Sequence, residues 1–515
     1  MAVLEPFWRE TADIPKFQTL EENGEADVVI VGGGITGITA AYLLVKAGLK
    51  IVLLEADTLL NGTTGHTTAK ITAQHDIIYD EFISHFGEDT AKLYYQANSE
   101  ALEWIQETVL AHHIPCDFKR QDAFLYATTE QSARKLETEW AAYQTLGIQG
   151  GLVGKIPFAI PIINALRMDN QAQFHPLQYL TRLVQFITEG GGRIFEHTTA
   201  VNVDKNGERT AVLTRDGHRV EAARVLVCSH FPFYEGLGLY SARLHADRSY
   251  CLACRTKTSY PGGMYLSVDQ PTRSLRSVTY HGEELVIIGG ESHKTGQGKD
   301  TREHYQALET FGREVMGAEK ILYQWSTQDL GTLDKIPYVG PVTEGEPRIL
   351  IATGYRKWGM TTGTAAAHLL ADYVLDRDTP YRELYTPSRF QADPSLKKLI
   401  KENANVVANL VKGKLEKPDT HLEQLAKDEG AVITLGGERK GAYRDREGKL
   451  HIVDTTCTHV GCEVNWNAGE RTWDCPCHGS RFSYTGEVVE GPAEKPLKKH
   501  HYDMLDNLTD EGSGY

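Results

Sequence analysis

The stretch DVVIVGGGITG (residues 27–37) decides the fold of most of this chain. It begins as an apolar strand and ends in a glycine turn. A helical pattern follows, and KIVLLE (residues 50–55) then supplies a second strand, so the order is a βαβ opening. Strand-like runs recur, with helical patterns between them, at RVLVCS (224–229), ELVIIGG (284–290) and RILIATG (348–354). We therefore expect a large α/β body that reaches to about residue 385.

The glycine turn carries the G-x-G-x-x-G spacing of a dinucleotide-binding motif at Gly32, Gly34 and Gly37. The first glycine permits a tight turn, the second lets the backbone approach a pyrophosphate, and the third allows close packing of helix on strand. Glu55, at the end of the second strand, can accept the hydroxyls of an adenosine ribose. Glycines also serve ordinary turns, but the strand before and the helix after favour a dinucleotide site. NAD and FAD are both possible on this motif.

Length, composition and charge restrict the possibilities. At 515 residues the chain exceeds the size of one hydrophobic core, so we expect two or three domains. With 41% apolar and 24% charged residues, it has the composition of an ordinary globular protein. A formal net charge of -15 repels polyphosphate backbones, which disfavours nucleic acid and leaves small molecules and proteins as partners. The N-terminus has no secretory pattern and no long apolar run occurs, so we expect a cytoplasmic protein without membrane association.

Cysteine and histidine cluster near the C-terminus. Four of the eight cysteines lie between residues 457 and 477, and in a cytosolic chain this indicates a metal site before a disulfide scaffold. CTHVGC (457–462) and CPCHGS (475–480) resemble the Rieske-type [2Fe-2S] domain, in which two thiolates hold one iron and two imidazoles the other. A zinc site is the alternative, but these motifs are more particular than zinc spacing. The predicted ligands are Cys457, His459, Cys475 and His478.

The resemblance to Rieske domains implies further roles nearby. Cys462 and Cys477 match a pair that forms a disulfide in respiratory Rieske proteins, although a cytosolic disulfide is unusual. VEGPAEKPL (489–497) matches the loop that covers the cluster, and Ser480 matches a hydrogen-bond donor to a bridging sulfide. Phe482 stands where high-potential members have tyrosine, and the loss of a donor lowers the potential. We expect a potential below the respiratory members, inside a range of about −150 to +300 mV.

A linker is expected before this domain. Between residues 386 and 430 the composition changes, and KKLIKENANVVANLVKGKL (397–415) has the apolar spacing of an amphipathic helix. Its lysines permit an interfacial membrane role, but a helix that joins two domains is the commoner case. From residue 431 the segments are short and strand-like, separated by glycines and charged turns, which predicts a small antiparallel β domain.

Longer segments of the body indicate which of the two cofactors, FAD or NAD, is bound. They are ADTLLNGTTGHTTAKITAQ (56–74), WSTQDLGTLDKIPYVGP (325–341) and ATGYRKWGMTTGTAAAHLLADYVL (352–375). These segments resemble the FAD-dependent oxidoreductases of the glycine oxidase/D-amino-acid oxidase superfamily, in the bacterial branch that carries a C-terminal Rieske domain. The resemblance covers nearly the whole chain and includes PFWRETADIP (6–15), HPLQYLTRL (175–183) and SHKTG (292–296).

This resemblance implies the domain organisation. The expected parts are an N-terminal arm (1–26), an FAD-dependent oxidoreductase domain (27–385), a helical linker (386–430) and an all-β Rieske domain (431–515). An α/β FAD-binding fold, Rossmann-like and of the D-amino-acid oxidase and glutathione reductase type, would take about 27–80, 175–230 and 320–385. An α+β substrate subdomain with an antiparallel sheet would take about 81–174 and 231–319.

Two segments are expected at the flavin. In the family the GTTGH loop runs along the isoalloxazine, and the late ATG…GTAAAHLL segment brings amides and a helix N-terminus, which stabilise negative charge on a reduced flavin. NGTTGHTT also resembles loops that attach FAD covalently through histidine in dimethylglycine- and sarcosine-dehydrogenase-like enzymes. Because Gly65 replaces the bulky residue usual before that histidine, a noncovalent pocket histidine is the alternative. The candidate FAD residues are Thr63, Thr64, His66, Gly354, Trp358, Gly359, Met360 and Thr361.

Substrate residues are harder to predict. The superfamily transfers a hydride from the carbon next to an amine nitrogen to flavin N5, and a carboxylate on the substrate would require an arginine–tyrosine pair. Several residues lie in plausible segments, but none belongs to a motif, so packing or surface roles explain them equally well. The catalytic candidates are Tyr250, Tyr280, Tyr355 and Arg356, with Arg248, Trp325 and Lys357 as further pocket residues.

Two cofactors in one chain indicate an enzyme. We expect an FAD-dependent oxidoreductase that acts on the CH–NH or CH–NH2 group of an amine or amino acid and passes electrons singly through the Rieske cluster to an acceptor. The alternative is an electron-transfer flavo-iron-sulfur protein that serves a partner redox protein and has no amine substrate; a redox sensor is a third possibility. Cys251 and Cys254 form a C-x-x-C, but in a strand-like segment we expect buried structural thiols.

Overall fold

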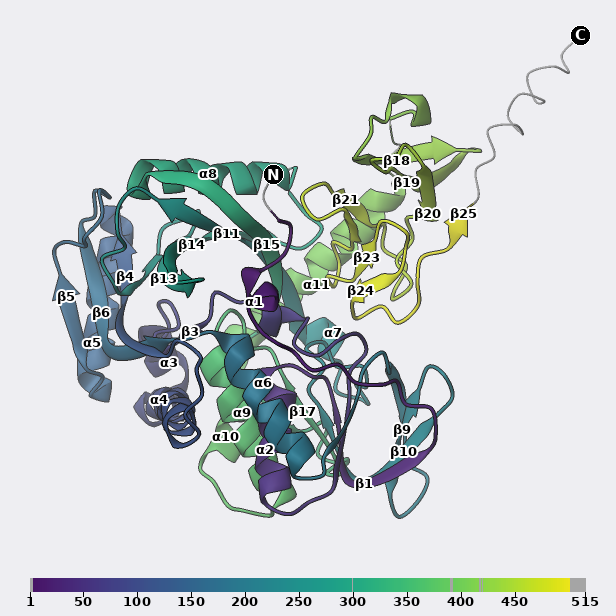
Figure 1. Ribbon diagram of the computed structural model, residues 1–515, viewed down its shortest axis with the longest axis horizontal. Helices are drawn as coiled ribbons and strands as arrows, with labels where there is room; N and C mark the ends of the chain where they lie inside the picture. The colour runs from purple at the N-terminus through teal and green to yellow at the C-terminus, as the bar shows by residue number, and fades with distance from the viewer. Residues whose placement is uncertain (1–2, 299, 390–391, 416–417, 419, 501–515) are drawn as a thin grey trace, which may run out of the picture. The chain divides into compact units, whose positions relative to one another are not determined.

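The computed structural model describes residues 3–298, 300–389, 392–415, 418 and 420–500, and Figure 1 labels its elements. Parts of the expected N-terminal arm, substrate subdomain, linker and Rieske domain (1–2, 299, 390–391, 416–417, 419 and 501–515) lie outside the described residues. By its internal contacts the chain divides into two units. The first comprises Met1–Ser292 and His304–Leu399, and the second comprises His293–Glu303 and Ile400–Tyr515.

The first unit contains a mixed sheet built around the predicted βαβ opening. In β1, Val28 and Ile30 face one hydrophobic core and Val29 and Val31 face another, which is why this strand is a continuous apolar run. It pairs in parallel with its neighbours on both sides. The strand order is β16 (Tyr338–Pro341), β17 (Ile349–Thr353), β10 (Arg219–Val227), β1 (Gly24–Val31), β2 (Ile51–Leu54) and β7 (Arg193–Phe195), with β9 (Thr210–Thr214) paired on β10 and β8 (Ala200–Asp204) paired on β9.

Helices cover one face of this sheet. α2 (Ile35–Lys46) begins directly after the glycine turn and packs against α6 (Pro176–Glu189) and α9 (Gly359–Val374), as Figure 1 shows. The short α1 (Phe7–Glu10) contacts α6, and its Phe7 and Trp8 side chains are completely buried. The N-terminal arm is therefore part of the main hydrophobic core.

The first unit also contains a nine-stranded, mostly antiparallel sheet. The strand order is β15 (Ala318–Thr332), β11 (Leu244–Thr256), β14 (Glu283–Lys294), β13 (Arg273–Tyr280), β12 (Met264–Ser267), β4 (Lys119–Ala127), β6 (Asn164–Gln173) and β3 (Lys70–Ile71), with β5 (Gly150–Val153) on β6. Because β15 pairs with β11 along its length, residues 318–332 belong to this sheet. The sequence instead predicts that residues from about 320 onward belong to the FAD-binding part.

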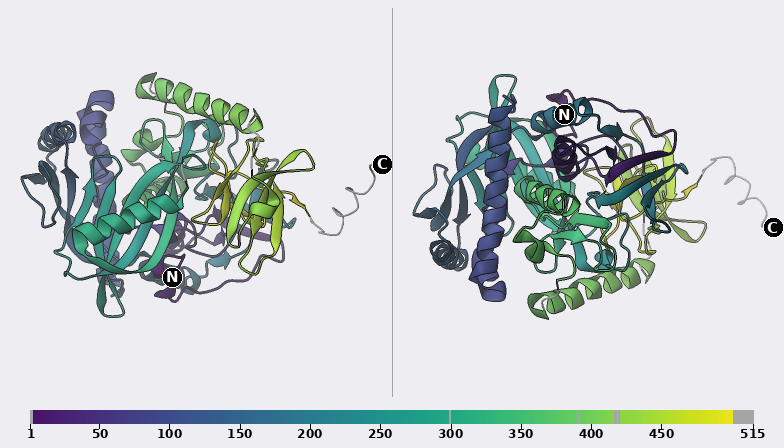
Figure 2. Two further views of the ribbon diagram at one scale, coloured as in Figure 1. Left: turned by 90° about the horizontal axis from the view of Figure 1, so that it is seen from above. Right: turned by 90° about the horizontal axis from the view of Figure 1, so that it is seen from below.

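The two faces of the nine-stranded sheet have different neighbours. Cys251 and Trp325 lie in the main core on the face we call inner, whereas Tyr250 and Leu252 lie in a separate cluster on the outer face, together with residues of α8 (Arg302–Met316). Figure 2 shows α8 lying across this outer face and α4 as the long helix near α9. The remaining helices are η1 (Thr63–His66), α3 (Tyr79–Phe86), α4 (Glu88–Ala111), α5 (Glu130–Leu146), α7 (Tyr240–Arg243) and α10 (Tyr381–Tyr385).

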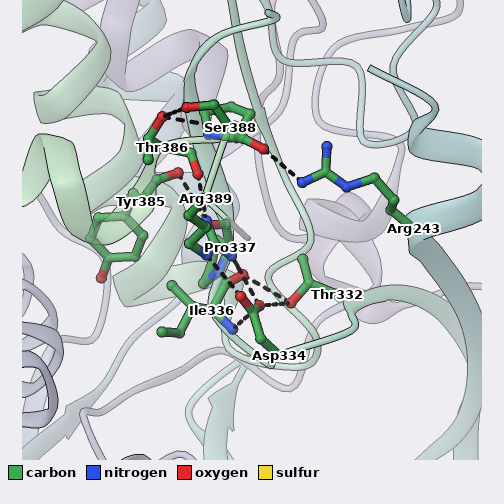
Figure 3. Close-up of polar contacts among 10 residues, drawn as sticks. Arg243, Thr332, Asp334, Ile336, Pro337, Tyr385, Thr386, Ser388 and Arg389 are labelled. Atoms are coloured by element: carbon green, nitrogen blue, oxygen red, sulfur yellow. Dashed lines mark hydrogen bonds and ion pairs between the residues drawn. The ribbon is translucent and has the colours of Figure 1, made fainter. Parts of the chain in front are cut away.

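A buried ion pair anchors the chain just before α11 (Figure 3). Arg389 Nε and Nη2 donate to the two carboxylate oxygens of Asp334 at 2.8 and 3.0 Å, and the two side chains are only 10% and 3% exposed. Its Nη1 donates to the main-chain oxygens of Pro337, Tyr385 and Thr386. Arg389 thus ties the beginning of the expected linker to the turn that follows β15. The helix predicted in that linker is α11 (Ala392–Leu415).

The second unit contains two four-stranded antiparallel sheets. Short strands joined by glycines and charged turns form them, so the predicted small β domain is confirmed. A short η2 (Leu422–Gln424) precedes the first strand. One sheet consists of β18 (Glu429–Leu435), β19 (Glu438–Arg444), β20 (Leu450–Asp454) and β25 (Lys499–His500), and the other of β21 (Asn465–Asn467), β22 (Thr472–Asp474), β23 (Arg481–Ser483) and β24 (Val488–Glu490).

Across the described part of the chain, none of the helices combines the length and the apolar character that a membrane crossing requires.

Candidate functional site

The glycine turn after β1 has the backbone shape that the dinucleotide motif predicts. Gly32 has a φ of +110°, and a Cβ there would lie 2.4 Å from Cys228 O. A Cβ on Gly37 would lie 2.0 Å from Gly32 O, which would prevent the helix from packing so closely on the turn. Gly34 comes immediately before α2, where a Cβ would meet Thr64 Oγ1 at 3.0 Å. Gly32 and Gly37 leave no room for a Cβ and Gly34 leaves little, and the bare backbone suits a pyrophosphate.

Glu55 lies beside the turn at the end of β2. Its Oε2 accepts from Gly33 N at 2.7 Å and its Oε1 accepts from Asp57 N at 3.0 Å. Burial raises the pKa of Glu55, while the two backbone donors act in the opposite direction. Each carboxylate oxygen still has a second lone pair, so the group can also accept ribose hydroxyls. The acceptor oxygens of Glu55 and the glycine turn beside it fit a bound dinucleotide.

The predicted flavin loop forms the short helix η1 and contacts the start of α2. Thr64 Oγ1 accepts from Ile35 N at 3.0 Å, and Thr63 Oγ1 donates to Gln328 O on β15 at 3.0 Å. His66 Nδ1 lies 3.0 Å from Gly62 O. The loop therefore joins the nucleotide-binding turn to the inner face of the nine-stranded sheet.

Two tryptophans from distant parts of the sequence donate hydrogen bonds to backbone carbonyls at the end of this loop and just after it. Trp325 Nε1 donates to His66 O at 2.9 Å, and Trp8 Nε1 donates to Thr67 O at 2.9 Å. Both indoles are buried, at 1% and 0% exposure. The N-terminal arm therefore contributes directly to the candidate site, a role that the sequence did not indicate.

Arg276, on β13, binds the next two carbonyls. Its Nη1 donates to Thr68 O at 2.7 Å and to Ala69 O at 2.6 Å, and its guanidinium lies 5.6 Å from the centre of the Trp8 ring. Burial lowers the pKa of Arg276 to about 9. Ala69 has a φ of +57°, and these hydrogen bonds hold its backbone in that conformation. Four successive carbonyls, 66 to 69, are thus bound by side chains.

Lys70 follows on β3 and is the titratable group that sequence reasoning missed. Its Nζ donates to Tyr265 O at 2.9 Å and to Ser274 Oγ at 2.7 Å. Burial lowers the pKa of Lys70 to about 7, with a further contribution from the charge of Arg276. Cys251 is close enough to Lys70 for their charges to interact, and burial raises the pKa of its thiol to about 12. In the sequence Lys70 looks like an ordinary lysine, and no motif singles it out.

The late segment of the oxidoreductase domain surrounds a buried histidine. His75 Nε2 lies 3.1 Å from Thr361 Oγ1, and its ring stacks on Trp358 at 4.9 Å. Burial and the charge of Arg356 hold the pKa of His75 well below its usual value. Gly359 is the first residue of α9, and the buried Met360 follows it. Gly354 has a φ of +83°, and a Cβ there would lie 2.4 Å from Thr332 Cγ2.

The four catalytic candidates do not come together. Tyr250 lies on the outer face of the sheet, where its ring stacks on His304 at 4.8 Å, because alternate residues of a strand face opposite sides. Tyr280 OH is 2.7 Å from Tyr323 OH, near α1. Tyr355 OH accepts from Thr36 Oγ1 at 3.0 Å, at the start of α2. Arg356 has a φ of +53° and donates to His75 O at 3.5 Å.

The further pocket candidates are also separated. Arg248 is completely buried on the strand that carries Tyr250, and its Nη1 donates to Ser326 Oγ. Trp325 binds the flavin loop as described. Lys357 is exposed, yet it is among the charges that act on Cys251. Cys251 and Cys254 are free, buried thiols on β11 whose pKa values burial raises to about 12, as expected of structural cysteines.

In the second unit the predicted cluster ligands converge. Cys457 and Cys475 are 2% and 1% exposed, and the ring centres of His459 and His478 lie 5.0 Å apart. A hydrogen bond from Cys475 lowers the pKa of Cys457 to about 7. Burial lowers the pKa of His478 to about 4, and within the described part of the chain its buried Nδ1 has no hydrogen-bond partner. A thiol poised to ionise and a neutral imidazole nitrogen without a partner fit iron ligation.

The neighbouring residues surround these ligands. Cys462 and Cys477 form a disulfide, and Cys475 Sγ lies within 4.8 Å of both sulfurs. Ser480 Oγ accepts from Ala493 N at 3.0 Å, which brings the loop at Gly491 and Pro492 beside the ligand loop. The completely buried Phe482 packs in the same cluster as Cys457 and Cys475.

Comparison with known proteins agrees with both sites. The family "FAD dependent oxidoreductase" matches residues 27–373, and the family "Rieske [2Fe-2S] domain" matches residues 416–501. The YhfW protein of Bacillus subtilis (strain 168), whose name describes a Rieske 2Fe-2S iron-sulfur protein, is 54% identical over 495 residues, covering 96% of this chain and 97% of that one. Gamma-glutamylputrescine oxidoreductase of Escherichia coli (strain K12) is 26% identical over 394 residues, covering 70% and 85%.

Solved structures support the fold of the first unit. Glycine oxidase from Geobacillus kaustophilus superposes with a TM-score of 0.61 at 17% identity, covering 72% of this chain and 100% of that one. This chain belongs to the FAD-dependent oxidoreductase family and carries a C-terminal Rieske domain. It is an FAD-dependent oxidoreductase whose first unit binds FAD and whose second unit binds a [2Fe-2S] cluster. The predicted fold class and cofactors are therefore confirmed.

Proposed function

We propose that this oxidoreductase oxidises the C–N bond of an amine or amino acid and that the electrons leave singly through the Rieske cluster to an external one-electron acceptor. When bound, FAD accepts a hydride and the cluster accepts one electron at a time. The residues proposed to hold FAD are the glycine turn, Glu55, the η1 loop and the beginning of α9. The proposed cluster ligands are Cys457, His459, Cys475 and His478.

One observation carries the proposal, and it is the state of Lys70. An amine substrate arrives from water as an ammonium ion, and the carbon next to the nitrogen cannot give up a hydride until the nitrogen has a lone pair to form the imine. A base with a pKa near the working pH is the suitable proton acceptor. Burial lowers the pKa of Lys70 to about 7, so its neutral form is populated at physiological pH.

The contacts of Lys70 suit this role. A neutral lysine amine has two N–H donors and one lone pair, and Tyr265 O and Ser274 Oγ are placed to accept the two donors. The lone pair then remains for the proton of the substrate ammonium. Lys70 also follows directly on residues 66–69, whose carbonyls are bound by Trp325, Trp8 and Arg276. The proton acceptor and the proposed flavin loop are therefore consecutive parts of one hydrogen-bonded segment.

The relatives supply a consistent substrate class. Gamma-glutamylputrescine oxidoreductase is named for an amine, and glycine oxidase is named for an amino acid. These names support an amine or amino acid here without selecting one. We further propose that the protein works in the cytoplasm, where a small redox protein would serve as the acceptor.

The proposal can be tested by mixing the oxidised protein anaerobically with a panel of N-methylated amino acids, unmodified amino acids and polyamines. Flavin and cluster absorbance are followed separately. We expect rapid loss of flavin absorbance with one chemical class, followed by reduction of the cluster. The matched variants are Lys70→Met, which removes the base, and Lys119→Met, which removes an exposed lysine on β4.

The two possible functions give different results. If no amine reduces the flavin, but a reduced partner protein does, the chain is an electron-transfer protein without an amine substrate and the proposal is wrong. If Lys70→Met reacts as fast as the unmodified protein at every pH, amine oxidation stands but Lys70 is not the proton acceptor.

A further inference from the structure

The second unit contains a segment that the Rieske motifs do not reveal. The chain leaves the first unit after Ser292 near the end of β14, and it returns at His304 in the first turn of α8. The residues between them, His293–Glu303, group with the Rieske sheets, and we call them the excursion segment. The sequence predicts that these residues belong to the substrate subdomain. The Rieske family match, residues 416–501, does not include them.

Gly296 of the excursion segment touches the backbone of a predicted iron ligand. Its φ is +69°, and a Cβ there would lie 2.7 Å from both Cys475 C and Pro476 N and 2.8 Å from Asp474 O. The two main chains are thus in contact without any side chain between them. No residue larger than glycine can occupy this position unless the peptide bond between Cys475 and Pro476 moves.

Gln297 makes a directed hydrogen bond to the same loop. Its Nε2 donates to Pro476 O at 2.9 Å and to Asn405 Oδ1 of α11 at 2.9 Å. Both hydrogens of the amide are therefore used, and the amide is held between the ligand loop and α11. Pro476 has no N–H of its own, so its carbonyl is the one polar backbone group that it offers to the excursion segment.

Further contacts fix the segment on both sides of this point. Asn465 Nδ2 donates to Gly296 O at 2.9 Å, and Thr301 Oγ1 donates to Asn467 Oδ1 at 2.7 Å while accepting from Gly469 N at 2.8 Å. Asn467 Nδ2 in turn donates to Asp474 Oδ2 at 2.7 Å. An ion pair between Lys294 and Glu402 joins the segment to α11. The excursion segment is thus bound at its beginning, middle and end.

We propose that Gly296 and Gln297 are positioning residues of the iron–sulfur site, which hold the peptide bond between Cys475 and Pro476 and adjust the reduction potential of the cluster. The inference rests on the proposed function only in that it assigns the cluster the role of electron outlet. A segment of the oxidoreductase domain sequence thereby completes the Rieske unit.

The physical effect has a definite sign. An N–H dipole directed at the ligand loop stabilises the extra negative charge of the reduced cluster and so raises its reduction potential. Removing the donor lowers the potential, and replacing it by a carboxylate lowers it further, because a negative charge beside the ligand loop opposes the addition of an electron to the cluster. A ligand loop that cannot shift also keeps the geometry of the Cys475 thiolate unchanged when the cluster changes its charge.

The first experiment measures the cluster of full-length protein without any substrate. Gln297→Ala and Gln297→Glu are titrated with dithionite and redox mediators, and the spectrum of the reduced cluster is recorded by electron paramagnetic resonance. We expect the midpoint potential to fall in the order wild type, Ala, Glu, with a shift of the g-values. Gln424→Ala and Gln424→Glu are matched controls in the same unit, where Gln424 accepts from His421 N. We expect no change in these controls.

The second experiment uses two glycines of the excursion segment. Gly296→Ala places a methyl group against the peptide bond of Cys475, whereas Gly298→Ala changes a glycine of φ +107° whose added Cβ would come no closer than 3.8 Å to His293 Nδ1. Both substitutions strain the backbone, but only the first reaches the ligand loop. We expect Gly296→Ala to lose iron relative to bound FAD and Gly298→Ala to retain both. If the two variants contain equal amounts of iron, the close contact between Gly296 and the peptide bond of Cys475 is contradicted.

The outcomes separate this inference from the proposed function. Unchanged potentials and g-values in both Gln297 variants overturn the inference, whatever the protein oxidises. A lowered potential supports it even if no amine reduces the flavin, because dithionite supplies the electrons. If the Gln297 and Gln424 variants shift the potential equally, the effect is a general one of the unit and the positioning role is wrong.

Discussion

Arg276 Nη1 donates to the main-chain oxygens of both Thr68 and Ala69, at 2.7 and 2.6 Å, across more than two hundred residues of sequence. This one group joins the nine-stranded sheet to the segment that follows the proposed flavin loop. Trp8 and Trp325 bind the two preceding carbonyls. The loop therefore owes its conformation to side chains from the N-terminal arm, β13 and β15, not to local hydrogen bonds alone.

Replacing Arg276 should loosen this loop. Arg276→Met leaves the Thr68 and Ala69 carbonyls without their donor in a buried place, and each unpaired group costs about 1–3 kcal/mol. We expect a lower thermal midpoint and a lower FAD content in the purified protein. Arg255→Met is the matched control, since its ion pair with Glu283 is solvent-exposed and is worth about 0–1 kcal/mol. Equal loss of flavin in the two variants would contradict the role of Arg276.

Lys70 should give amine oxidation a pH dependence. Lys70 is neutral above its pKa of about 7. The rate at which an amine substrate reduces the flavin should therefore rise as the pH increases through that value. Stopped-flow measurement of flavin absorbance between pH 6 and pH 9 checks this, with Lys119→Met as the control. Lys70→Met should lose the rise near pH 7. A profile that is unchanged in Lys70→Met would assign the titration to another group.

The folding stability should depend on pH through Lys70, and the shifted pKa of this lysine gives the direction of the change. Lys70 has a pKa of about 7 in the folded chain against an ordinary value of 10.5, so the folded state binds fewer protons between these values. The contribution of Lys70 to stability therefore rises with pH across this window and is least favourable below pH 7. Lys70→Met removes the dependence. Denaturant titrations at pH 7 and pH 10 should show the variant gaining more, relative to wild type, at pH 7.

Covalent attachment of FAD at His66 is open to a simple test. His66 Nδ1 lies 3.0 Å from Gly62 O and Gly65 precedes the ring, so we expect noncovalent FAD that acid precipitation releases into the supernatant. Flavin fluorescence that stays in the protein pellet would contradict this expectation. In that case His66→Ala should release the flavin, and His85→Ala, an ordinary helix histidine in α3, should not.

Phe482 should hold the cluster potential down. It is completely buried and packs with Cys457 and Cys475, so Phe482→Tyr places a hydroxyl donor close to the cluster without enlarging the ring. A donor near the cluster sulfurs raises the potential. We expect a higher midpoint in a mediated dithionite titration of Phe482→Tyr, and no rise in Phe482→Leu, which changes packing alone. A midpoint that Phe482→Tyr leaves unchanged would refute this account.

Much of the architecture could be predicted because its signals are local. The glycine spacing at residues 32–37 and the strand before it define the nucleotide turn, and the pairs CTHVGC and CPCHGS define the Rieske unit. The amphipathic pattern of 397–415 became α11. Each of these signals lies within a few residues, where spacing alone determines which groups lie together.

The substrate side could not be predicted in the same way. Tyr250 and Cys251 are neighbours in sequence, yet they face opposite sides of β11, and no motif indicates which side faces the flavin loop. Lys70 looks ordinary in a strand, and its lowered pKa comes from burial beneath residues of β12 and β13. The pairing of strands decides such relationships.

The sequence by itself determined the two cofactor-binding folds, since glycine spacing and the Cys/His pairs are short-range constraints that the chain satisfies locally. Only the tertiary structure decided how the sites are completed. Arg276 reaches the loop at Thr68 and Ala69, and Gly296 reaches the peptide of Cys475, from segments separated by more than 170 residues. Such contacts arise because buried carbonyls and close-packed backbones must find partners wherever the fold brings them.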